Sequence, residues 1–168
     1  MPLLKALLLL YSTLFTSLPT LALSPTFTAN DIAREITNRG VNSVVAELGE
    51  TGVRQEITHK ITTGDSNWVK LAFKLTQSMH LDFSKEILYA LSIALINNPV
   101  DVLAAADKEK NISLADICTI PPELETRENK IKFVDKVRKS LESITDYEIK
   151  GRVEECFWEL NKAYNVEF

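Results

Sequence analysis

The stretch Ile87-Leu88-Tyr89-Ala90-Leu91-Ser92-Ile93-Ala94-Leu95-Ile96 decides the fold of this 168-residue chain. It is apolar nearly all round, so a helix over these residues must be enclosed by neighbouring elements. Its ten residues are fewer than the roughly 20 that cross a bilayer, and charged residues at 82, 85 and 86 precede it. We therefore expect a buried core helix and no stable membrane insertion of the mature chain.

Toward the N-terminus, glycines separate short runs with helical spacing. Thr28 and Asp31 have the spacing of a capping box, and the helix that follows should stop at Gly40. A second run should break at Gly49 and a third should end at Gly64. The next helix carries one apolar stripe, comprising Trp68, Leu71, Ala72, Leu75 and Met79.

Toward the C-terminus, Asn97-Asn98-Pro99 should end the core helix, and the proline suits the first turn of the next one. Two longer amphipathic helices close the chain. Their apolar stripes run from Ile131 to Ile144 and from Ile149 to Tyr164, and Thr145-Asp146-Tyr147-Glu148 reads as the capping box of the second. So short a connection predicts an antiparallel hairpin.

No alternating apolar and polar stretch competes with these helical patterns. The predicted fold class is all-α: an irregular multi-helix bundle of short helices with a C-terminal antiparallel helical hairpin. A helical solenoid would also use short helices joined by Gly and Pro, but it requires a repeat of fixed period, which is not evident.

The N-terminus has the layout of a signal peptide. Lys5 precedes an uncharged, leucine-rich run over residues 6–18, which is too short for a permanent anchor. Thr20 and Ala22 place small residues where a signal peptidase accepts them. We expect residues 1–22 to be the signal peptide, residues 23–168 to form a single helical domain, and the protein to be periplasmic or secreted.

The two cysteines, Cys118 and Cys156, both lie in the predicted mature chain. An even number of cysteines in an oxidising compartment predicts a disulfide, which here joins the last helix to the segment before the hairpin. Two sulfurs are half of a structural zinc site, so we expect no metal. The chain carries 23 acidic and 19 basic residues, a balance that disfavours nucleic-acid binding.

Residues with catalytic potential do not form a known constellation. Glu56 and His59 have the Glu-x-x-His spacing, but a di-iron bundle needs two such pairs and two more glutamates, so a solvated helix face is favoured. Glu154 and Glu155 are adjacent, and adjacent helical residues point in different directions. No nucleophile elbow or phosphate-binding glycine loop is present. We predict no catalytic residues and no cofactor.

Two surface features of the hairpin bear on partners. The first helix carries a basic cluster over residues 130–139, and the second carries glutamates that can balance it, which favours pairing between the helices over an acidic partner or lipid. Trp158 lies about 180° from Ile149 and off the apolar stripe. It should pack under the N-terminal segment around Phe27 or, if exposed, anchor a protein partner.

Several of these motifs together resemble a group of small exported Gram-negative bacterial proteins of unassigned function. The likeness covers about residues 30–160 and rests on the Gly64 to Trp68 turn, the Ala- and Leu-rich helix that ends in Asn98-Pro99, and Ile117-Cys118 near Pro121. The resemblance implies a periplasmic location and brings no catalytic residues.

The function we expect is that of an exported, non-enzymatic helical protein that binds another protein, as an inhibitor or toxin-neutralising partner does. One alternative is an enzyme or small-ligand carrier with a pocket among the central helices, where Tyr89 and Ser92 supply polar groups and Glu56, His59 or His80 would carry chemistry. Another is a structural component of the envelope.

Overall fold

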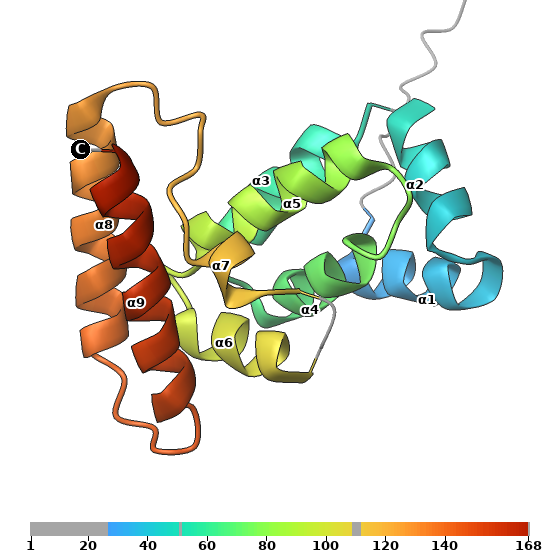
Figure 1. The fold of residues 1–168 in the computed structure, drawn as a ribbon. Helices are drawn as coiled ribbons and strands as arrows, with labels where there is room; N and C mark the ends of the chain where they lie inside the picture. The colour runs from blue at the N-terminus through green and yellow to red at the C-terminus, as the bar shows by residue number, and fades with distance from the viewer. Residues whose placement is uncertain (1–26, 51, 109–111, 168) are drawn as a thin grey trace, which may run out of the picture.

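The computed structural model describes residues 27–50, 52–108 and 112–167. The predicted signal peptide, residues 1–22, lies outside this part of the chain. The described residues form nine helices and no strand, which confirms the all-α prediction (Figure 1). The helices are α1 (Ala29–Arg39), α2 (Val41–Glu50), α3 (Arg54–Thr62), α4 (Ser66–Leu75), α5 (Leu81–Ala94), α6 (Pro99–Lys108), α7 (Leu114–Ile117), α8 (Arg127–Glu142) and α9 (Lys150–Glu167).

The predicted core helix is α5, and it occupies the middle of the bundle. It packs against α3, α4, α6 and α7. Ile87, Leu91 and Leu95 are fully buried, as is the hydroxyl-bearing Ser92. The Ser92 hydroxyl donates to the Leu88 carbonyl one turn earlier, so its burial leaves no unpaired donor.

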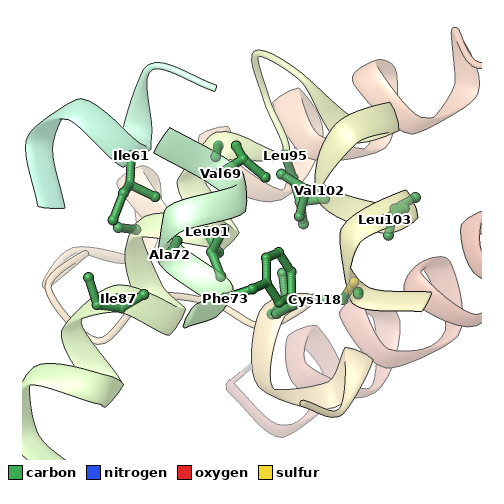
Figure 2. Packing of buried hydrophobic residues seen from close by; sticks show 14 of the residues in the cluster. Ile61, Val69, Ala72, Phe73, Ile87, Leu91, Leu95, Val102, Leu103 and Cys118 are labelled. Carbon is green, nitrogen blue, oxygen red and sulfur yellow. The ribbon is translucent and has the colours of Figure 1, made fainter. Parts of the chain in front are cut away.

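Buried apolar side chains from all nine described helices form one cluster. Figure 2 shows part of its centre, where Phe73 of α4 lies between Leu91 of α5 and Cys118 at the end of α7. Val102 and Leu103 of α6 close the other side of this group. Helices this short are marginally stable in isolation, so these are stabilised by burying their apolar faces against one another.

Glycine ends two of the early helices as predicted. Gly40 and Gly64 have φ of 83° and 77°, the left-handed region in which glycine costs least. The prediction that Gly49 breaks a helix is wrong, because α2 continues through it to Glu50. The guanidinium of Arg54 packs there, with Nη2 2.6 Å from where a Cβ of residue 49 would lie, so glycine gives Arg54 room.

The stripe predicted for α4 is one residue too long. Trp68, Leu71, Ala72 and Leu75 face the cluster, but α4 ends at Leu75 and Met79 is 81% exposed. The Met79 amide donates to Oδ1 of Asn42 at 2.7 Å, and this bond holds the turn between α4 and α5 against α2. With the helix ended, the four-residue spacing no longer places Met79 on the buried face.

Hydrogen bonds join the turn between α3 and α4 to the turn between α5 and α6. Asn97 Nδ2 donates to the Thr62 carbonyl oxygen at 2.9 Å. The Ser66 hydroxyl donates to the carboxylate of Asp101, which also accepts from Asn98 Nδ2 at 2.9 Å. Two turns that are more than 30 residues apart in sequence are thereby fixed together.

The C-terminal hairpin has the predicted antiparallel arrangement of α8 and α9 (Figure 1). The capping box predicted at Thr145 is wrong: Asp146 Oδ1 accepts from the Glu148 amide at 2.9 Å in a local turn, and α9 begins at Lys150. Ile149 is buried, and its carbonyl accepts from the Val153 amide at 3.0 Å. Ile149 thus reaches the core immediately before the helix begins.

Candidate functional site

The position of α9 is fixed by the disulfide between Cys118 and Cys156. Their Cα atoms are 5.3 Å apart and both residues are buried. Cys118 ends α7, which itself packs on the core helix α5. The predicted disulfide therefore ties the hairpin to the centre of the bundle, and side chains on the outer face of α9 have a rigid support.

A groove of about 390 Å³ lies where α8 ends and α9 begins. Its apolar lining comes from both helices and their connection: Leu141, Ile144, Val153 and Phe157, with Tyr147. Leu141 is buried in the core, while Ile144, Val153 and Phe157 are partly buried. Tyr147 is 85% exposed, so a large aromatic ring stands free beside an apolar hollow.

Acidic groups dominate the rim of this groove. Glu142, Asp146 and Glu154 line it together with one base, Lys150. All four residues are exposed to solvent. The groove thus combines an apolar floor with a negatively charged edge.

Trp158 continues this surface along α9. It follows Phe157 directly and lies one turn after Glu154, which places it on the same side of the helix as Glu154. Its side chain is 62% exposed, and Lys162 Nζ lies 5.1 Å from the ring centroid. We call this groove, with Tyr147 and Trp158, the hairpin surface.

The prediction that Trp158 packs around Phe27 is wrong. Phe27 instead contacts Trp68, with ring centroids 6.1 Å apart and planes at 79°. Figure 1 gives the reason: α1, which follows Phe27, lies at the opposite end of the molecule from the hairpin. Trp158 therefore has the exposed environment that would suit a partner contact.

A lysine of the basic cluster of α8 and a glutamate of α9 each form an ion pair within their own helix. Lys132 pairs with Glu128 at 2.6 Å, and Lys162 pairs with Glu159 at 3.6 Å. Between the helices, Arg138 donates to Asn161, and its guanidinium carbon lies 5.5 Å from the centroid of the Tyr164 ring. The Arg138 contacts show how a basic residue of α8 helps to hold α9.

The residues suggested for a central pocket are only partly brought together. His59 and Tyr89 line a groove of about 420 Å³ between α3 and α5, beside Glu86 and Glu123. Glu56 is not part of that lining and pairs with Lys60 at 3.7 Å. His80 precedes α5 without a side-chain capping bond, and Ser92 is buried. The predicted polar set is thus dispersed over the fold.

In the described part of the chain, no group of three or more His, Cys, Asp or Glu side chains is arranged to hold a metal ion. None of the described helices combines the length and apolar character needed to span a membrane.

Comparisons with protein-family models, with curated proteins and with solved structures found no match.

Sequence reasoning singled out Trp158 but missed Tyr147 and the groove beside it. Tyr147 lies inside the capping box predicted at Thr145, and that motif predicts no role for its side chain. The groove arises from the ends of two helices and the loop between them, and no periodic pattern marks such a place.

Proposed function

We propose that the protein is an exported, non-enzymatic helical module that binds another protein through the hairpin surface, as an inhibitor or toxin-neutralising protein would. The observation that carries the proposal is two exposed aromatic side chains: Tyr147, which lines the apolar groove, and Trp158, which lies one helical turn after the groove residue Glu154. Tyrosine and tryptophan are enriched among the residues that supply most binding energy at protein interfaces.

Rigidity is the second support for this function. The disulfide from Cys156 to Cys118 and the buried stripe of α9 hold the helix that carries Trp158. Lys162 Nζ lies over the Trp158 ring, 5.1 Å from its centroid. A surface that is already ordered loses little conformational entropy when a partner binds.

The charge at the rim of the groove favours a basic partner. Glu142, Asp146 and Glu154 favour a protein segment that carries Lys or Arg around an apolar anchor. The anchor would enter between Val153 and Phe157, and the basic groups would meet the acidic rim. Binding of this kind weakens as salt is raised.

Export is part of the proposal. The layout of residues 1–22 and the disulfide, which persists in oxidising compartments, both favour a periplasmic or secreted protein. Mass spectrometry of the protein from fractionated producing cells tests this. We expect an envelope or medium fraction with a chain that begins at Leu23; a full-length chain in the cytosol with reduced thiols contradicts it.

The binding function is tested by placing a photoreactive benzoylphenylalanine at position 147 and, as a control, at Asn38 on the exposed end of α1. Irradiation in the producing cells should give one protein adduct from position 147 and not from position 38. Trp158→Ala and Glu154→Lys should each diminish that adduct. The purified partner should then bind the unmodified protein, and more weakly at high salt.

Failure to form an adduct from position 147, or formation of the same adducts from both positions, contradicts the proposal. So does an adduct whose yield is unchanged by Trp158→Ala and by Glu154→Lys. Circular dichroism and the melting temperature of each variant show whether the fold is retained.

A further inference from the structure

A cavity of about 350 Å³ lies between α1, α4 and α6, away from the hairpin surface. The charged residues among those that line it are three lysines: Lys70 and Lys74 of α4 and Lys108 of α6. Asn30 and Asn67 add two side-chain amides, which donate hydrogen bonds. Three lysines and two asparagines, all exposed to solvent, therefore line one open hollow formed by three helices.

These lysines form a local positive charge on a protein that has a formal net charge of −4. Lys70 and Lys74 are four residues apart on one face of α4, a spacing at which like charges repel. Asp101 interacts electrostatically with Lys70 but is not among the residues that line the cavity. The lining residues include three lysines and no Asp or Glu, so the lining itself carries a net positive charge that a bound anion would meet.

The remainder of the cavity is apolar. Ala29, Ala33 and Ala105 line it, together with Leu71 and Phe73, which belong to the core. The small alanine side chains leave the space that larger residues would fill. A pocket with mostly apolar walls and a few converging polar groups is typical of small-ligand sites.

We propose that this cavity binds a small organic phosphate, with the phosphoryl group at the three lysines and the apolar part against the alanines. A phosphate monoester carries between one and two negative charges at neutral pH, which suits several ammonium groups better than a single carboxylate does. Lysine binds phosphate as a compact point charge. This site is separate from the hairpin surface and does not depend on the proposed binding of a protein.

The test is calorimetric titration of the purified protein with hexyl phosphate, inorganic phosphate and hexanol. Co-sedimentation with phosphatidylcholine vesicles, with and without phosphatidic acid, distinguishes a lipid headgroup from a soluble ester. The key variant is Lys70→Gln/Lys74→Gln. Its matched control is Lys136→Gln/Lys139→Gln, which removes the same charge from two exposed lysines of α8.

We expect saturable binding of hexyl phosphate that is tighter than binding of either fragment. The Lys70→Gln/Lys74→Gln change should weaken it by about tenfold or more, and the control pair should leave it within about twofold. Lys108→Gln, on a different helix, gives an independent reading if the double variant does not fold. Binding to phosphatidic acid vesicles with the same variant pattern also supports the proposal and identifies a lipid as the source.

Equal loss of binding in the two double variants would show general attraction to charge and overturn the proposal. Absence of saturable binding both to hexyl phosphate and to phosphatidic acid vesicles overturns it as well. Tight binding of hexanol alone would also overturn it, because the lysines would then contribute nothing.

Discussion

The carbonyl oxygen of Gly64 accepts a hydrogen bond of 2.8 Å from Nδ2 of Asn98. Gly64 lies in the turn between α3 and α4, and Asn98 lies in the turn between α5 and α6. The bond therefore joins these two turns. A Cβ at position 64 would lie 2.9 Å from Asn98 Cβ and 3.1 Å from the Asn98 backbone nitrogen. Glycine is required at this contact both for its conformation and for its size.

Gly64→Ala should therefore lower the free energy of unfolding by about 2 kcal/mol or more. The left-handed backbone conformation costs an L residue about 1–2 kcal/mol, and the close approach to Asn98 adds to that cost. Urea denaturation measures the change. The control is Gly151→Ala, where the space is open and φ is not positive. That variant should be neutral or more stable by less than about 1 kcal/mol; equal losses at both sites would contradict the argument.

Asp101 should make stability depend on acid pH. The Ser66 hydroxyl, and after it Asn98 and the charge of Lys70, hold the pKa of Asp101 below its ordinary value of 3.8, against the opposing effect of burial. The unfolded chain then binds the proton more readily than the folded protein does. The stabilisation of the folded state by ionised Asp101 is therefore present above about pH 4 and is lost as pH falls through the folded pKa.

Asp101→Asn is the variant that tests this dependence. It should be less stable than the wild type at pH 7, and the difference should shrink between about pH 4 and pH 2. Denaturation at a series of pH values measures it. Asp135→Asn, at an exposed position of α8, serves as control. A difference between wild type and Asp101→Asn that stays constant over this range would rule out the proposed role.

Loss of the disulfide should destabilise the protein by about 2–5 kcal/mol. Cys118→Ala or Cys156→Ala removes the constraint on a loop with a sequence separation of 38. Thermal melting with and without reductant is the measurement. The wild type should melt lower in reductant, and Cys118→Ala should not respond. Equal melting temperatures of the wild type in both conditions would show that the bond contributes nothing.

Trp158 and Leu160 should respond differently to truncation although they are two residues apart on α9. Trp158 is 62% exposed and Leu160 is 1% exposed. Trp158→Ala should change the free energy of unfolding by less than about 1 kcal/mol, because it loses mainly the contact with Lys162. Leu160→Ala should cost about 2–5 kcal/mol through the cavity it leaves. A large loss for Trp158→Ala in urea denaturation would show that the tryptophan is structural.

Local signals in the sequence were reliable where the physics is local. The capping box at Thr28 forms, and Pro99 begins α6, because each depends on residues within one turn. The capping box predicted at Thr145 is absent, because Asp146 accepts from the Glu148 amide in a local turn and α9 begins only at Lys150. The prediction that Met79 belongs to the apolar stripe of α4 was wrong because the helix ends at Leu75. Beyond that residue a spacing of four no longer places side chains on one face.

By itself, the sequence determined the helical class, the apolar core helix and the pairing of Cys118 with Cys156. These features depend on the spacing of apolar residues, on the positions of glycine and proline, and on the number of cysteines, all of which are properties of the chain alone. Only the tertiary structure decided that Trp158 stays exposed, that Tyr147 lies beside a groove, and that three lysines line one cavity. Helical spacing defines which face of a helix a residue occupies. Which neighbour covers that face depends on contacts between segments far apart in sequence.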